Sequence, residues 1–298
     1  MNREKSPERW ANDLSILLTQ VLGEARFPVD VERLAIEYSH QVFPASPITR
    51  VRSRSFRGFE GALIPKPDRS GEWGIGYADS LVSKGRVNFT IAHEFGHYLL
   101  HREKYPNGLQ CRPEDMIKWD SEYNMVEAEA NRFAAGLLMP LDDFRAQIPE
   151  KQNADLHVLS TCAERYEVSL TAAILRWLSY TRKRAILVVS RDGFIKWARS
   201  SEPAFKSGAF IKVAGLSPRE IPAGSPVARN PDVVGIVDPE SLDRGTWLNE
   251  PVMEHSLISD RFDLSISLLT LEGTVPVSRV EDEHIEDAVD FLGRRTGW

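Results

Sequence analysis

The stretch that decides the fold is Thr90-Ile91-Ala92-His93-Glu94-Phe95-Gly96-His97-Tyr98, which contains the pattern His-Glu-x-x-His. Residues four apart on a helix face the same side, so the imidazoles of His93 and His97 can reach one metal ion. Glu94 would then lie beside the ion without binding it, where it can take a proton from water. The alternative is a pair of hydrogen-bonded histidines at the edge of a core helix, so the surrounding sequence has to decide.

The residues around this motif favour a metal site. On a helical wheel the apolar residues share one arc, and the two histidines border it: Phe89, Ala92, Gly96, Leu99 and Leu100. A site built on two histidines needs a third protein ligand and leaves the fourth position for water. His101 would lie about 12 Å along the helix from His93, too far to share the ion. We expect His101 near the helix end, where a positive charge is favoured.

The third ligand is expected on the next helix, residues 122–138. On its wheel Glu127 shares the apolar arc, whereas Glu129 lies about 160° away and is expected to be a solvated surface acid. A carboxylate on the apolar face needs a partner, because burying an isolated charge is costly. That partner could be the metal, or an arginine in a buried salt bridge. Asn131, one turn from Glu127, could hydrogen-bond the free ring nitrogen of a ligand histidine.

Hydrophobic spacing predicts where the remaining elements lie. Helices are expected at residues 7–22, from an Asp30 N-cap onward, and at 87–100, 156–166 and 170–178. Short apolar runs between Val42 and Tyr77, separated by Pro and Gly, predict a small twisted sheet. Strands are expected at 186–189, 210–213, 233–237 and 264–268, and a closing helix at 283–292. A boundary near residues 180–185 would divide the chain into domains 1–182 and 183–298.

The composition is typical of a globular protein of about two domains. The 298 residues are 42% hydrophobic and 27% charged, and the formal net charge of −6 argues against a broad basic surface for nucleic acid. No run approaches the roughly 18 apolar residues of a membrane-spanning helix, and the polar start at residues 1–7 lacks a signal-peptide core. Cys111 and Cys162 make no disulfide framework. We therefore expect a soluble cytoplasmic protein with two free thiols.

Two blocks, Arg86–His97 and Glu127–Pro140, together resemble the ImmA/IrrE family of metallopeptidases, and the resemblance covers about residues 30–178. It implies an α+β fold with a reduced zincin-like core, in which a small sheet accompanies the His-Glu-x-x-His helix. It also implies that His93, His97 and Glu127 bind Zn²⁺ and that Glu94 is the general base. The Glu-x-x-x-Asp pattern of related zincins has Asn131 here in place of Asp. A helix-turn-helix-like segment at 156–180 would belong to this core, and a β-rich C-terminal domain would follow.

Family members typically cut a helix-turn-helix repressor of the XRE type and so switch on stress-response or mobile-element genes. The resemblance therefore implies a zinc endopeptidase whose protein substrate is a separate XRE-family repressor. Tyr98 and Tyr123 are candidates for stabilising the oxyanion. The resemblance ends near Tyr180, so it does not assign a role to the C-terminal domain.

Two other functions fit parts of the sequence. The chain could be a DNA-binding transcriptional regulator that uses residues 156–178, with a structural or vestigial metal site. The second helix of this segment, however, offers few polar residues for reading bases, namely Ser169, Thr171 and Arg176, so we do not expect direct DNA binding. Alternatively, the C-terminal strands could form a sensor or partner-docking module that controls the peptidase.

Overall fold

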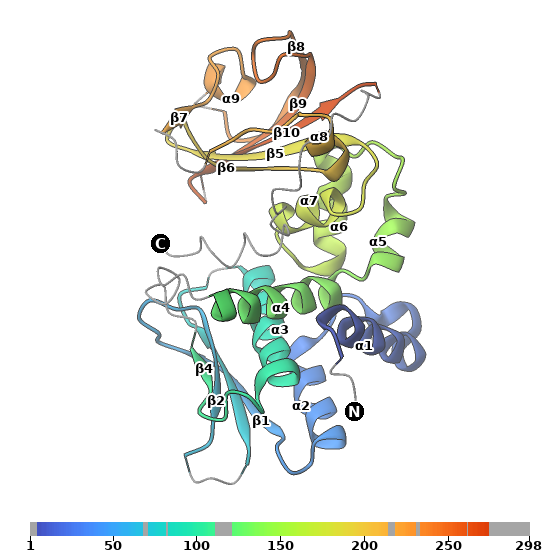
Figure 1. Ribbon diagram of the computed structural model, residues 1–298, viewed down its shortest axis with the longest axis vertical. Coiled ribbons are helices and arrows are strands. Elements are labelled where there is room, and N and C mark those ends of the chain that lie inside the picture. The colour runs from blue at the N-terminus through green and yellow to red at the C-terminus, as the bar shows by residue number, and fades with distance from the viewer. Residues whose placement is uncertain are drawn as a thin grey trace. The chain divides into compact units, whose positions relative to one another are not determined.

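The computed structural model describes residues 5–67, 71–81, 83–110, 121–213, 218–230, 233–260 and 262–273 (Figure 1). It has mixed α and β structure, as the sequence predicts, and divides into two compact units. The first comprises the described residues up to Asp143 together with Ala163–Ala172, and the second comprises Phe144–Cys162 and the described residues from Ala173 onward. In the described part of the chain, none of the helices combines the length and apolar character that crossing a membrane requires. The predicted domain boundary at residue 182 stays a prediction.

The first unit begins with two helices whose ends are set by local chemistry. α1 (Pro7–Leu22) starts after Ser6, whose hydroxyl oxygen accepts a hydrogen bond from the Arg9 backbone N–H. It ends at Gly23, whose φ of 56° favours glycine. A short 3₁₀ helix, η1 (Gly23–Arg26), follows. α2 (Val31–Val42) is capped by Asp30, which accepts from the Arg33 N–H at 3.1 Å. Both helices confirm the predictions.

A small four-stranded sheet comes next. Its first three strands lie in the region predicted for a small sheet, residues 42–77, apart from one residue, whereas its fourth strand was not predicted. Its strands are β1 (Ile48–Arg54), β2 (Gly61–Pro65), β3 (Trp73–Ala78) and β4 (Leu109–Gln110). Their spatial order is β1-β3-β2-β4, in which β3 pairs parallel with β1 and antiparallel with β2. β2 also pairs with the two-residue β4. This mixed sheet adjoins the first of the two helices that carry the candidate site.

Those two helices, α3 (Lys84–His101) and α4 (Ser121–Leu138), lie side by side (Figure 1). Ser83 caps α3, and α4 ends shortly before Pro140, which disfavours helical conformation at the preceding residue. At Gly96 the helices come so close that an added Cβ would lie 2.9 Å from the Phe133 ring and 3.3 Å from the Ala130 Cα. The absence of a side chain at Gly96 therefore permits the packing that brings the site together.

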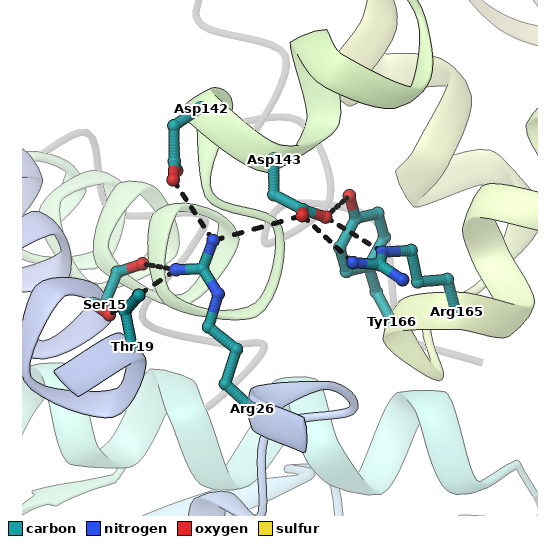
Figure 2. Close-up of polar contacts among 7 residues, drawn as sticks. All are labelled: Ser15, Thr19, Arg26, Asp142, Asp143, Arg165 and Tyr166. Carbon is teal, nitrogen blue, oxygen red and sulfur yellow. Dashed lines mark hydrogen bonds and ion pairs between the residues drawn. The ribbon is translucent and has the colours of Figure 1, made fainter. Parts of the chain in front are cut away.

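Helices α5 (Leu141–Gln147), α6 (Leu156–Tyr166) and α7 (Leu170–Leu178) follow, and only α5 was not predicted. A polar network holds the end of α6 within the first unit (Figure 2). Both oxygens of Asp143 accept from Arg165 at 2.9 Å, and the Tyr166 hydroxyl donates to the same carboxylate at 2.6 Å. Arg26 reaches Asp142 at 3.1 Å and donates to the Ser15 hydroxyl at 2.7 Å.

The second unit contains a six-stranded antiparallel sheet in the order β7-β6-β5-β10-β9-β8. Its strands and the short helices between them are β5 (Arg184–Arg191), β6 (Phe194–Ser200), α8 (Glu202–Lys206), β7 (Arg219–Glu220), α9 (Pro226–Arg229), β8 (Gly235–Leu242), β9 (Val252–Ser259) and β10 (Leu264–Leu271). A hydrophobic core covers one face of this sheet and includes Ile186, Trp247 and Leu269. The β-rich C-terminal region is therefore confirmed.

Several predictions for this region need correction. The strand predicted at residues 210–213 is wrong. Ile211 is buried and Phe210 is exposed, but this segment pairs with no strand among the described residues. The strand predicted at 233–237 is shifted, since β8 begins at Gly235 and continues to Leu242. β6 and β9 were not predicted. The closing helix at 283–292 lies outside the described residues.

A buried carboxylate is the unusual feature of β9. Glu254 is fully buried and accepts hydrogen bonds from three hydroxyl groups and one indole N–H, which belong to Ser225, Ser256, Ser267 and Trp247 at 2.5–2.9 Å. Four donors therefore compensate the burial of this polar group.

Candidate metal centre

Three side chains from α3 and α4 converge on one point. His93 and His97 lie one turn apart on α3, and their Nε2 atoms are 2.9 Å from each other. The two carboxylate oxygens of Glu127 on α4 lie 3.2 Å from these nitrogens, one oxygen from each. Within the described residues, these three form a group of ligand atoms that could hold a metal ion.

The spacing of these atoms suits a small tetrahedral cation. An ion with bonds of about 2.0–2.1 Å separates its ligand atoms by about 3.3 Å. The observed separations of 2.9–3.2 Å are close to that value. Two imidazoles and one carboxylate are also the donor set of many catalytic zinc sites, which leave one position open. The residues present therefore fit a metal ion.

The outer ring nitrogens of both histidines have partners. Asn131 Oδ1 lies 2.9 Å from His93 Nδ1, so the ring N–H can donate to the amide oxygen and leave Nε2 free to bind a cation. His97 Nδ1 lies 3.0 Å from His101 Nδ1, and His101 Nε2 lies 2.9 Å from Glu129 Oε2. Both histidines are thus held in the orientation that directs Nε2 toward Glu127.

Glu94 lies next to this group and is 1% exposed. Its Oε2 atom is buried and has no hydrogen-bond partner among the described residues. Burial raises its pKa to about 8, and the nearby charge of Glu127 adds to the increase. β2 approaches the carboxylate closely at Gly61, where an added side chain would collide with Glu94 Oε1 and lie 2.7 Å from Thr90 Cγ2. A water molecule bound beside a metal ion would need a hydrogen-bond acceptor, and this buried carboxylate oxygen could serve as one.

Without a metal ion, the pKa values of His93, His97 and Glu127 are all shifted from their usual ranges. Burial alone would lower the pKa of His93, but the hydrogen bond and charge of Glu127 outweigh burial and raise this pKa to about 9. Burial lowers the pKa of His97 to about 4 despite the nearby carboxylate. The pKa of Glu127 falls well below its usual range, because the two histidines outweigh its burial. The raised pKa of His93 and the lowered pKa of Glu127 both express the attraction between these two side chains.

Sequence reasoning missed the contact between Glu129 and His101. Glu129 was expected to be a plain solvated acid, but its side chain is only 39% exposed and pairs with His101. His101 lies at the end of α3, as expected, but it is also buried. The signal available was the third histidine at four-residue spacing, after His93 and His97.

The remaining candidates lie elsewhere or outside the described residues. The Tyr98 hydroxyl is committed to the backbone carbonyl of Ser46, to which it donates at 2.7 Å. Neither the side chain of Tyr123 nor Cys111 is among the parts described. Cys162 is buried and forms no disulfide with any described residue. The structure therefore gives no oxyanion-stabilising role to Tyr98.

Comparison with known proteins places this geometry in a family. Residues 47–178 match the family model of peptidase M78, described as an IrrE N-terminal-like domain. These residues include α3, α4 and all three potential ligands. A comparison with curated proteins finds no match. Residues 47–178 therefore form a domain similar to the IrrE N-terminal-like domain of the peptidase M78 family.

Proposed function

We propose that this protein is a zinc-dependent endopeptidase. The observation that carries the proposal is the convergence of His93, His97 and Glu127 beside a buried Glu94 whose Oε2 atom has no partner among the described residues. A set of hydrogen-bonded core histidines would not require a second buried carboxylate without a donor. The family match supports the same chemistry.

The residues of this centre would share the work of peptide hydrolysis. His93, His97 and Glu127 would hold the ion. When bound, zinc supplies Lewis acidity, which polarises a peptide carbonyl and lowers the pKa of water. Glu94 would accept a proton from the attacking water at its carboxylate and donate it to the leaving amine.

The metal assignment is tested by plasma mass spectrometry of the purified protein before and after addition of zinc. We expect about one zinc per chain in the wild type and a large loss in Glu127→Ala. Glu103→Gln changes an exposed glutamate at the end of α3 and is the matched control, which should keep its zinc. A wild type that binds no zinc even after loading would refute the metal site.

The role of Glu94 is tested separately from metal binding. Glu94→Gln removes the proton acceptor while keeping the shape of the side chain, so we expect retained zinc and a loss of cleavage of at least about 100-fold. Glu103→Gln should cleave like the wild type. A Glu94→Gln variant with wild-type turnover would refute this mechanism.

We further propose that the substrate is an XRE-family repressor in the cytoplasm and that its cleavage switches on stress-response or mobile-element genes. The support is the family's typical substrate, so the test must be open to other answers. Proteome extracts treated with wild type or with Glu94→Gln are compared for new N-termini. Such a repressor among the proteins cut only by wild type supports the proposal. Cut proteins that include no repressor would refute this substrate and leave the peptidase intact.

The alternative, a DNA-binding regulator, gains little support from the described helices. Most residues of α7 are buried and none is fully exposed, whereas a recognition helix needs an exposed polar face. The turn before α7 also contacts α3, because Glu167 accepts a hydrogen bond at 2.7 Å from Lys84, the first residue of α3. Sequence-dependent gel shifts at physiological salt by the chain alone would reverse this preference.

We propose a controlling role for the C-terminal strands, as a sensor or as a docking module for the repressor. The second unit includes Phe144–Cys162, so removal of residues 183–298 alone would divide it. The test therefore uses substitutions on exposed apolar residues of this unit, such as Val234→Ser. Cleavage of the repressor should fall, while cleavage of a short unstructured peptide should stay unchanged. Equal loss on both substrates would contradict a docking role.

A further inference from the structure

The two histidines of the metal centre differ in what holds their outer nitrogens. His93 Nδ1 faces the neutral amide of Asn131, whereas His97 Nδ1 faces another imidazole, that of His101. His101 is 4% exposed, and its second nitrogen lies 2.9 Å from the Glu129 carboxylate on α4. A buried histidine thus joins His97 to a charged group on the neighbouring helix.

We propose that His101 and Glu129 are positioning residues that fix the tautomer and orientation of His97, an inference that rests on the proposed metal site. If Nε2 of His97 binds metal, the ring proton must be on Nδ1. His97 Nδ1–H then donates to His101 Nδ1, which leaves the proton of His101 on Nε2. From there His101 donates to Glu129 Oε2. With His101 neutral and Glu129 as the acceptor, each of these hydrogen bonds has one donor and one acceptor only when His97 presents the Nε2 lone pair to the metal.

The hydrogen bonds from His97 through His101 end at the Glu129 carboxylate, which carries a negative charge. The Asn131 amide that contacts His93 is neutral. A negative charge at the end of a hydrogen-bonded chain raises the basicity of the ligand nitrogen, and loss of such partners costs about 10–100-fold in metal affinity. The hydrogen bond between His101 and Glu129 contributes little to folding, because the Glu129 side chain is 39% exposed. Removal of this carboxylate should therefore weaken metal binding much more than it lowers folding stability.

The experiment measures zinc affinity by competition with a chromophoric chelator, alongside the melting temperature of the metal-free protein. The variants are His101→Ala, Glu129→Gln and the conservative His101→Gln, whose amide can still accept from His97 and donate to Glu129. The matched control is Glu8→Gln, which removes a carboxylate that pairs with Arg132 on the same helix α4 at 3.0 Å. All measurements use the full chain.

We expect the dissociation constant for zinc to rise about 10–100-fold in His101→Ala and by a smaller factor in Glu129→Gln. His101→Gln should recover most of the affinity, and Glu8→Gln should match the wild type. If Glu129→Gln and His101→Ala bind zinc as tightly as the wild type, the inference is wrong. If His101→Ala does not fold, Glu129→Gln and His101→Gln decide the matter by the same criteria. A wild type that binds no zinc refutes the proposed metal site itself, which is a different result.

Discussion

Replacement of Gly96 by alanine tests whether close helix packing assembles the metal centre. Gly96 lies between the two histidines on α3, at the point where α3 meets α4. An added Cβ would lie 2.9 Å from Phe133 Cδ1 and 3.3 Å from the Cα and carbonyl oxygen of Ala130. Phe133 is fully buried and packs edge-to-face against Phe95, and Ala130 presents its backbone. Neither neighbour can move aside without disturbing the core.

Two opposing effects decide the sign of the change. Alanine is favoured over glycine inside a helix by about 1 kcal/mol. Overpacking of a filled core typically costs about 1–3 kcal/mol. Because the closest contact is with a buried ring and the next is with backbone, we take the middle of this range. The free energy of unfolding should therefore fall by about 1 kcal/mol, and the shifted helices should also bind zinc more weakly.

Urea unfolding of the metal-free protein measures this change. Phe133→Leu removes the ring edge, so a double-mutant cycle with Gly96→Ala should show a favourable coupling of about 1 kcal/mol. In the Phe133→Leu background the alanine should be close to neutral. If Gly96→Ala raises the free energy of unfolding in the wild-type background, helix propensity outweighs packing and the reasoning about close approach is wrong.

Three further substitutions separate catalysis from stability. Gly61→Ala should displace the Glu94 carboxylate and lower kcat about 10-fold or more with zinc retained, as measured by peptide cleavage and metal content; unchanged kcat would contradict the contact. Asp143→Asn should lower the free energy of unfolding at pH 7 by about 1–2 kcal/mol, because Arg165 holds the pKa of the carboxyl below 3.8 despite partial burial. A lowered folded-state pKa stabilises the protein above pH 3.8, so the difference from wild type should disappear as the pH falls through that pKa; a constant difference would count against it. Tyr98→Phe should cost about 1 kcal/mol of stability and leave kcat unchanged, and a large fall in kcat would restore its oxyanion role.

Much of the candidate site could be predicted from sequence, because its residues obey the geometry of single helices. The four-residue spacing of His93 and His97 alone predicts a shared face, and the cost of a buried charge singles out Glu127. The contact between His101 and Glu129 could not be predicted in the same way. A helical wheel gives each residue one direction, whereas a long glutamate side chain can bend around its helix to reach a neighbour. The metal and the roles of these residues remain predictions.

The fold shows the same division between local and long-range information. Helices α6 and α7 have the predicted bounds, since spacing and the Ser169 cap define them locally. The predicted strand at 210–213 shows that a short run with apolar residues can bury a side chain without pairing as a strand. β6 could have been found, because Asp192 and Gly193, both with positive φ, form the two-residue turn that pairs it with β5. β9 could not, because Glu254 and Ser256 occupy its buried face.

The buried Glu254 has a consequence for how the six-stranded sheet chooses its pairing. Successive side chains of a strand point to opposite faces, so a slip of one residue along β9 would turn this carboxylate away from its donors. Ser225, Trp247 and Ser267 come from three other segments, and each would lose its acceptor at the same time. If this face were entirely apolar, a one-residue shift in the register of β9 would cost less free energy. The hydrogen bonds of Glu254 make such a shift strongly unfavourable. In this sheet a polar group specifies alignment, and the surrounding apolar residues supply the stability.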